Sequence, residues 1–224
     1  MITAEEKSTG LPRIGDAAPI FDGPTTQGPI SLDDFKGNWV VLFSHPSDFT
    51  PVCTTEIIAL NNLQPEFKKR GVELIGLSID SVPSHIAWIR NIEEKTGNKI
   101  TFPIIADSDR YVSTLYGMIH PRQSKTHTVR CVFIIDPGQI VRAMLYYPAS
   151  IGRNVDEILR IVDSLQTADK HSVSIPANWR PGDPVVIPSP DTQEKAEERM
   201  KEDYECIDWY LCKKNLSGND GNPY

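Results

Sequence analysis

The sequence predicts an α/β fold in which helices cover a mixed β-sheet. Short apolar runs of strand length alternate along the chain with longer segments that have helical spacing of their apolar residues. Near the end of this pattern two strand-like runs follow each other directly, which indicates a β-hairpin. The chain has 224 residues, of which 39% are hydrophobic, so it can bury a core without structural disulfides or metals.

The first half of the pattern contains two strands and two helices. The apolar run WVVLFS at 39–44 predicts a buried strand. Apolar residues at helical spacing over 53–69 predict a helix, which Pro65 should kink and Gly71 should end. The run VELIGLSI at 72–79 predicts a second buried strand, and residues 84–94 a second helix.

The second half predicts the hairpin and a closing helix. Residues 102–106 are expected to form a strand and residues 110–116 a short helix. The runs at 128–136 and 140–146 flank Pro-Gly-Gln, a tight-turn sequence, and form the hairpin. An amphipathic helix at 154–165 closes this part of the chain and supplies one more covering helix for the sheet.

The composition changes after about residue 168. Five prolines fall between Pro176 and Pro190, so this segment predicts an extended arm or a small second unit. A charged helix is expected from Thr192 to about Lys214, and the last residues, SGNDGNPY, are expected to be a disordered tail. The predicted organisation is a domain at 1–168, an arm with its helix at 169–216 and a tail at 217–224.

Charge and hydropathy exclude several classes of protein. The net charge is −7, from 23 basic and 30 acidic residues, so we expect neither a nucleic-acid partner nor an anionic membrane surface. The first twenty residues lack the apolar core of a secretory signal, which predicts a cytoplasmic protein whose thiols are reduced. Its four cysteines then need a role other than structural bridging.

The segment FSHPSDFTPVCTTE places Cys53 at the start of the first predicted helix. Unpaired backbone N–H groups and the positive end of the helix dipole favour a thiolate at that position. Pro46 and Pro51 stiffen the loop, and Thr50 offers a hydroxyl to the sulfur or to a bound oxygen. The alternative from spacing alone is a buried core cysteine.

Arg130 lies inside an otherwise apolar strand. The period-two alternation of a strand puts Arg130 and Cys131 on opposite faces. A buried guanidinium needs a partner, and a thiolate at a nearby helix start is one candidate. A solvent-exposed strand end is the alternative for Arg130, and Cys131 is expected to be a core thiol.

Residues 46–53, Pro-Ser-Asp-Phe-Thr-Pro-Val-Cys, match the P-x-x-x-T-x-x-C signature of peroxiredoxins, and the flanking residues resemble the one-cysteine, Prx6-like branch. The resemblance covers nearly the whole chain. It implies a thioredoxin-like fold with a carboxy-terminal dimerisation arm, and a thiol peroxidase that uses no metal or organic cofactor. The implied partners are a hydroperoxide, a thiol reductant such as thioredoxin or a small thiol, and further copies of the chain in a homodimer or a decamer of five dimers. The alternative is a peroxiredoxin-like holdase chaperone or peroxide sensor.

The resemblance also implies roles for single residues. Cys53 becomes the peroxidatic cysteine, which attacks the peroxide and turns into a sulfenic acid. Thr50, the Cys53 backbone N–H and Arg130 are the expected donors to the peroxide oxygens, and Pro46 shields the sulfur from water. Glu56 orients Arg130, Arg153 braces the site and His45 lies near the sulfur, although a structural, hydrogen-bonded histidine is the alternative.

Two further cysteines lie near the end of the chain, at Cys206 and Cys212. In a regular helix their six-residue spacing gives about 9 Å of rise, beyond disulfide reach, so they are either independent or bond only after unwinding. Archaeal-type members of the branch carry a matching pair. That resemblance implies that Cys212 of a partner subunit resolves the sulfenic acid and that Cys206 then takes over the disulfide; two incidental thiols are the alternative.

Two other activities are not expected. Asn38 stands where some Prx6-like proteins carry a serine for phospholipase activity, and an amide is no acyl-accepting nucleophile. The cysteines and histidines show neither C-x-x-C nor H-x-x-x-H spacing, which argues against a zinc site and a thioredoxin-type dithiol.

Overall fold

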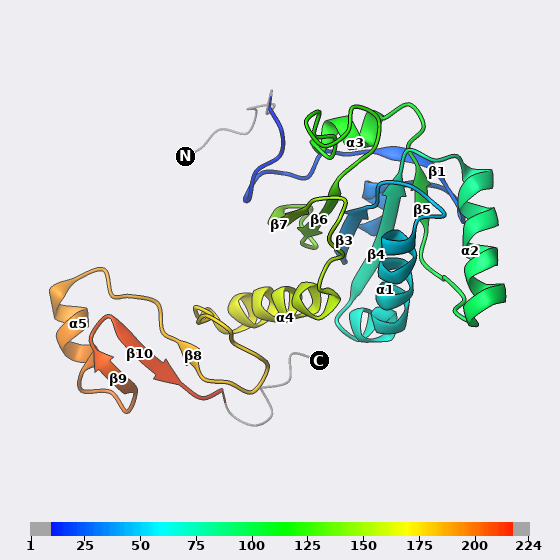
Figure 1. Cartoon of the computed structure of the whole chain (residues 1–224). Coiled ribbons are helices and arrows are strands. Elements are labelled where there is room, and N and C mark those ends of the chain that lie inside the picture. Colours follow the sequence, from blue (N-terminus) through cyan, green and yellow to red (C-terminus); the bar gives the residue numbers. More distant parts are fainter. Residues whose placement is uncertain (1–9, 217–224) are drawn as a thin grey trace. The chain divides into compact units, whose positions relative to one another are not determined.

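The computed structural model describes residues 10–216. The chain divides into two compact units, Met1–Val155 and Asp156–Tyr224. Figure 1 shows the first as a sheet with helices and the second as a helix followed by smaller elements. The expected disordered tail at 217–224 lies outside the described residues.

A seven-stranded mixed sheet organises the first unit. Its strand order is β2-β1-β5-β4-β3-β6-β7. The pairs β3–β4 and β4–β5 are parallel, and the other pairs are antiparallel, including the expected β6–β7 hairpin. The strand bounds are Asp22–Thr25 (β1), Gly28–Ser31 (β2), Trp39–Ser44 (β3), Val72–Ser78 (β4), Ile104–Ala106 (β5), Arg130–Ile135 (β6) and Val141–Tyr147 (β7).

The central strands form the core because they are apolar on both faces. Every residue of β3 and of β6 is buried, as expected for strands covered on both sides. The core cluster joins side chains of β3, β4 and β6 with Tyr116 and Met118. The fold is thioredoxin-like, as the resemblance implied.

Local sequence signals define the helices of this unit. Helix α1 spans Pro51–Lys69 and continues through Pro65, and Gly71 follows it with a φ of 66°. Helix α2 spans Val82–Thr96; the Ser81 hydroxyl caps it by accepting from the backbone N–H of Ser84. A 3₁₀ turn (η1) at Leu32–Phe35 and a short helix α3 at Tyr111–Leu115 complete the unit.

The second unit has a small core of its own. It contains helix α4 at Val155–His171, helix α5 at Gln193–Arg199 and a three-stranded sheet of order β8-β10-β9. The strands are Val185–Val186 (β8), Glu205–Asp208 (β9) and Leu211–Lys214 (β10). The proline-rich segment folds around Trp179, which is 2% exposed and packs with Val173 and Val185.

The long charged helix expected from Thr192 to about Lys214 is wrong. The helix ends at Arg199, and β9 and β10 form a hairpin that pairs Cys206 with Cys212. The helical signal comes from the charged run that α5 contains, whereas the residues beyond it form the two strands of the hairpin. No helix within residues 10–216 has the length and apolar character needed to cross a membrane.

Candidate active site

The sulfur of Cys53 lies in the first turn of α1, where the sequence predicted it. Thr50 is the N-cap of the helix in an extended conformation, and Pro51 occupies its first turn. Cys53 is fully buried. A guanidinium nitrogen of Arg130, Nη1, donates to its Sγ at 3.2 Å. The helix start of α1 and the strand β6 therefore meet at this sulfur.

A buried network of charges fixes Arg130. Its Nη1 also donates to Glu56 Oε2 at 2.6 Å, and its Nε and Nη2 donate to the carbonyl of Ala149. Arg153 donates to both oxygens of the same carboxylate, from Nε at 2.9 Å and from Nη2 at 2.8 Å. Burial opposes the charge on Glu56, but Arg153 and then Arg130 hold the pKa of that carboxyl below its usual value.

The two arginines of this network carry more positive charge than Glu56 can balance. Arg130 and Arg153 are 3% and 7% exposed, and Glu56 is 3% exposed, so two buried cations share one buried anion. Arg130 donates to the Cys53 sulfur, so a hydrogen-bond donor that carries a positive charge lies directly against it.

The structure places Thr50 and Pro46 in the loop between β3 and α1. The Thr50 hydroxyl donates to the carbonyl of Ser47 at 2.9 Å and not to the sulfur. Pro46 is partly buried. The neighbouring Phe49 has a φ of 53° and a side chain that is 59% exposed, a left-handed backbone that no sequence signal indicated.

His45 bonds to a residue that the sequence reasoning missed. The side chain is fully buried, and Nε2 lies 2.9 Å from Asp48 Oδ1. Its ring packs against Trp88 with ring centroids 5.0 Å apart, and the Trp88 indole donates to Thr54, next to Cys53. Asp48 also bonds to His85, which lies in helix α2. The i,i+3 spacing of His45 and Asp48 after a buried strand was the available signal.

Cys131 is a core thiol, as expected. It is fully buried beside Ser44 Oγ at 3.0 Å. Burial raises the pKa of its thiol to about 11, so the group stays protonated and unreactive at neutral pH.

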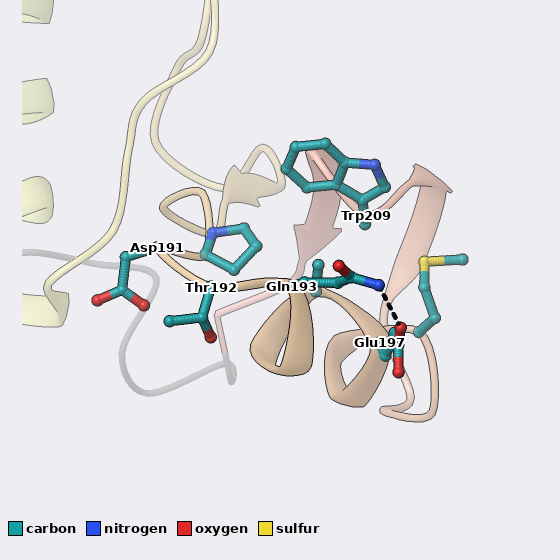
Figure 2. Close-up of a pocket in the computed structure, with 8 residues that line it drawn as sticks. Asp191, Thr192, Gln193, Glu197 and Trp209 are labelled. Carbon is teal, nitrogen blue, oxygen red and sulfur yellow. Dashed lines mark hydrogen bonds between the residues drawn. The ribbon is translucent and has the colours of Figure 1, made fainter.

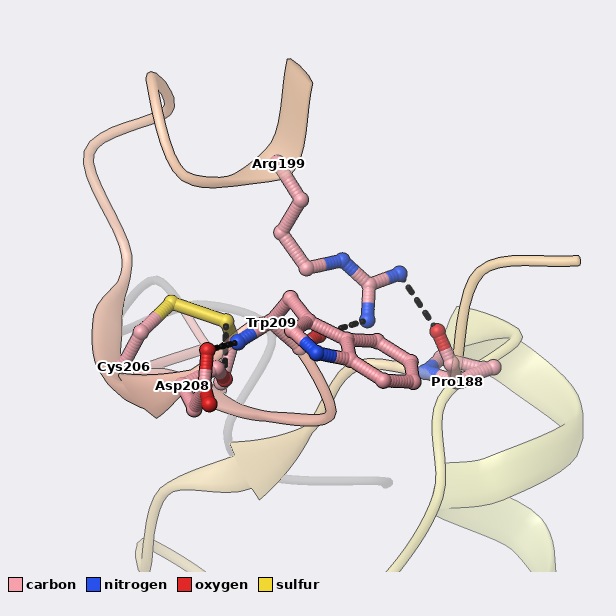
Figure 3. Close-up of a disulfide and its surroundings, with 6 residues drawn as sticks. Pro188, Arg199, Cys206, Asp208 and Trp209 are labelled. Carbon is pink, nitrogen blue, oxygen red and sulfur yellow. Dashed lines mark hydrogen bonds between the residues drawn. A yellow bond between two sulfur atoms is a disulfide. The ribbon is translucent and has the colours of Figure 1, made fainter. Parts of the chain in front are cut away.

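Cys206 and Cys212 form a disulfide across the β9–β10 hairpin, with Cα atoms 4.0 Å apart (Figure 3). The disulfide needs no unwinding of a helix, because this segment is a hairpin and its strand pairing brings the two cysteines together directly. Cys212 is fully buried and Cys206 is partly exposed. Arg199 supports the turn between them by donating to the carbonyls of Trp209 and Pro188.

A separate cleft of about 490 Å³ lies in the second unit between α5 and Trp209 (Figure 2). Three of its polar side chains have partners: Asp191 accepts from Lys195, and Gln193 donates to Glu197. No cysteine or histidine lines it.

Fold and site together define a thiol-based oxidoreductase, and the comparisons identify its family. Residues 14–144 match the AhpC/TSA family model, and residues 164–203 match the C-terminal domain of 1-Cys peroxiredoxin. A peroxiredoxin of Aquifex aeolicus is 56% identical over 217 residues, which cover 92% of this chain and 98% of the relative. The chain belongs to the peroxiredoxin family and is a peroxidase.

Solved structures give the same assignment. A yeast mitochondrial 1-Cys peroxiredoxin, described for its thiol resolving mechanism through glutathione and thioredoxin systems, aligns with a TM-score of 0.82 and 43% identity. The match covers 91% of this chain and 99% of that chain. A mutant of the peroxiredoxin 6 of Arenicola marina aligns with a TM-score of 0.81 and 36% identity, covering 92% and 99%.

Proposed function

We propose that this peroxidase reduces hydrogen peroxide and organic hydroperoxides through a sulfenic acid at Cys53. The observation that carries the proposal is the buried positive charge around the sulfur, where, among residues 10–216, Glu56 is the one carboxylate that pairs with both Arg130 and Arg153. Sulfur in such a position has a donor for the charge that it carries when it attacks a peroxide.

In the first step the Cys53 thiolate attacks the terminal oxygen of the hydroperoxide. An S–O bond forms and the O–O bond breaks, which leaves a sulfenic acid and an alkoxide or hydroxide that takes up a proton. Arg130 serves both ends of this step because its Nη1 already contacts sulfur, and it stabilises the charge that develops on oxygen. The Thr50 hydroxyl turns from the Ser47 carbonyl to the peroxide, and Pro46 limits water at the sulfur.

In the second step Cys212 of a partner subunit attacks the sulfenic sulfur, which gives a Cys53–Cys212 disulfide and water. Cys206 then attacks the Cys212 sulfur, which releases the Cys53 thiolate and forms the Cys206–Cys212 bond. The hairpin supports this order, since the strand register sets Cys206 opposite Cys212. Thioredoxin or a small thiol reduces the final disulfide, and the yeast relative's thiol systems are consistent with such a reductant.

We further propose a cytoplasmic homodimer that assembles into a ring of five dimers. The hairpin supports self-association because it exposes Ile207, Trp209 and Tyr210, which are 77%, 43% and 52% exposed. Apolar side chains gathered at one turn favour a protein contact.

Peroxide consumption over many turnovers with a thiol reductant tests the function and separates a peroxidase from a sensor. Cys53→Ser should abolish consumption, because a serine hydroxyl stays protonated at neutral pH. Cys131→Ser is the matched control, a buried thiol whose sulfur contacts Ser44 rather than Arg130, and it should retain turnover. Substantial turnover by Cys53→Ser would show that Cys53 is not the peroxidatic cysteine.

A further inference from the structure

The strand that carries Cys206 is the weakly held edge of the small sheet. In the order β8-β10-β9, the described residues give β9 one neighbour, β10. Cys206 is partly buried, and the other three residues of β9 are exposed. Strand β10 has a neighbour on each side, and the backbone N–H of Ile187 donates to the Cys212 carbonyl at 3.0 Å. Because an exposed edge opens more readily than a paired strand, Cys206 is the cysteine whose position needs support.

The turn of the hairpin does not supply that support. Asp208 pairs with Leu211, which leaves Trp209 and Tyr210 as a two-residue loop. The two-residue loops that match the twist of a hairpin need a positive φ at one or both central residues, and neither residue here has one. The register also shifts between Leu211 and Cys212. Turn and register therefore favour strands that splay apart at the two cysteines.

Arg199 holds this turn from outside the hairpin. It is the last residue of α5. Its Nη1 donates to the carbonyl of Trp209 at 3.2 Å, and its Nη2 donates to the carbonyl of Pro188. Figure 3 shows the guanidinium reaching both carbonyls. Pro188 directly follows Ile187, so one planar side chain ties the turn to the segment that anchors β10.

These contacts matter most when the disulfide is open. While the Cys206–Cys212 bond is closed, it holds the two strands together by itself. In the dithiol, and in the proposed Cys53–Cys212 intermediate, Cys206 can move away with its edge strand. The contacts of Arg199 go to backbone carbonyls and do not depend on the disulfide. They keep one sulfur close to the other and so raise its effective concentration.

We propose that Arg199 is a positioning residue for thiol–disulfide exchange in the hairpin: it holds Cys206 opposite Cys212, which speeds the attack of Cys206 and makes the closed disulfide harder to reduce. The inference rests on the proposed function and adds Arg199 to its second step. In that step the Cys206 thiolate forms a bond to the Cys212 sulfur, the Cys53–Cys212 bond breaks, and Cys53 leaves as a thiolate.

The reduction potential of the Cys206–Cys212 pair tests the inference. Full-length protein with Cys53→Ser, which removes the competing exchange, is equilibrated with reduced and oxidised dithiothreitol, acid-quenched and alkylated, and its thiols are counted by mass. The disulfide takes up two electrons and two protons from the dithiol, which closes to its cyclic disulfide. Adding Arg199→Met should lower the effective concentration about tenfold and make the potential about 30 mV less negative.

Two further variants separate positioning from charge. Arg199→Lys keeps a cation at the end of α5 but lacks the planar fork that reaches two carbonyls, so its potential should move in the direction of Arg199→Met. Lys195→Met is the matched control, because it removes a cation that the same helix pairs with Asp191. Its potential should equal that of the parent.

The rate of the second exchange gives an independent readout in protein that retains Cys53. Reduced protein receives one equivalent of peroxide, and samples are acid-quenched over time and separated on non-reducing gels. Arg199→Met should convert the Cys53–Cys212 dimer to the Cys206–Cys212 disulfide about tenfold more slowly than the parent, since the attacking sulfur is less often in place. Lys195→Met should follow the parent.

An unchanged potential in a folded Arg199→Met variant would overturn the inference. So would a parent-like potential in Arg199→Lys, or a shift in Lys195→Met as large as that in Arg199→Met. Failure of the proposed function is seen separately, as parent protein that forms no sulfenic acid at Cys53 with peroxide, because the potentials are measured without peroxide and without Cys53.

Discussion

At the scale of single residues, the contact between Arg130 and Cys53 places a guanidinium against the sulfur that we propose as the nucleophile. The sequence placed a cation on an apolar strand and a thiol at a helix start, and the structure brings Nη1 to 3.2 Å from Sγ. Strand periodicity could predict that Arg130 is buried, but not that the Thr50 hydroxyl points to Ser47. A hydroxyl rotates to whichever acceptor its own turn provides, so local sequence does not fix its partner.

Arg130→Met should slow sulfenate formation by about 10- to 150-fold, since a hydrogen bond to a charged group contributes about 1.5–3 kcal/mol. Stopped-flow tryptophan fluorescence with limiting peroxide measures this step. Arg142→Met is the control, because Arg142 lies on β7 and pairs with Asp136. An Arg130→Met variant as fast as the parent at neutral pH would show that the guanidinium does not act on the reacting atoms.

Glu56 makes stability depend on pH. Its folded pKa is lowered, against burial, by Arg153 and Arg130, so its stabilisation is present above the unfolded value of about 4.5 and is lost as pH falls through the lower folded pKa. Glu56→Gln should cost about 3 kcal/mol in the free energy of unfolding near pH 7. The difference from the parent should shrink in acid. Urea unfolding of both reduced proteins over this pH range checks the prediction, and a constant difference would contradict it.

At the scale of elements, the strands and helices that were predicted correctly are those whose sequence signals lie within the element itself. Strand β3 begins at Trp39 and ends at Ser44 as expected, because its apolar run and its flanking polar residues are both local. The strands β1 and β2 went unnoticed because their short sequences, DGPT and GPIS, read as turns. The hairpin β9–β10 was mistaken for helix because the charges of α5 dominate the preceding window.

The hairpin predicts which sulfur an external thiol attacks. Cys212 is fully buried, whereas Cys206 is partly exposed, and thiol–disulfide exchange needs access to the attacked sulfur. Attack on Cys206 forms a mixed disulfide there and releases the Cys212 thiolate. Brief treatment of the oxidised protein with a small thiol, acid quenching and peptide mass mapping should place the adduct on Cys206. An adduct mainly on Cys212 would show that access does not decide the site.

At the scale of the whole molecule, the two proposed redox sites lie in different units. Cys53 and its charge network belong to residues 1–155, and the disulfide belongs to residues 156–224. The described part of the chain shows each site complete in its own unit. Sequence resemblance implied the division of labour between these sites and a partner subunit as the source of Cys212, which stays a prediction.

Self-association should depend on the turn of the β9–β10 hairpin. Trp209 and Tyr210 are large and exposed there, and burying aromatic side chains stabilises interfaces. Sedimentation at micromolar concentration should show a dimer or larger species for the parent. Trp209→Ala with Tyr210→Ala should shift it toward smaller species, while Tyr111→Ala, an exposed tyrosine on α3, should not. A monomeric parent would refute the proposed assembly.

Cys212→Ser should uncouple peroxide attack from resolution. The variant keeps the network at Cys53, so it should reduce one equivalent of peroxide, but it should form no covalent dimer on a non-reducing gel. Its sulfenic acid should persist and oxidise further to sulfinic acid in excess peroxide. Cys206→Ser is the matched variant: it lacks the second exchange and should accumulate the Cys53–Cys212 dimer. The opposite pattern would assign resolution to Cys206.

Mixing two variants that lack complementary cysteines tests whether resolution crosses between copies. Cys53→Ser with Cys206→Ser retains Cys212 but lacks the second exchange, and Cys212→Ser retains Cys53, so neither can form the Cys53–Cys212 bond alone. If Cys212 acts on a partner subunit, co-refolded mixtures carrying different affinity tags should give a covalent heterodimer after one equivalent of peroxide. A parent that forms the Cys53–Cys212 bond only within one chain would give no such heterodimer, and resolution would then be a motion of each chain's own second unit.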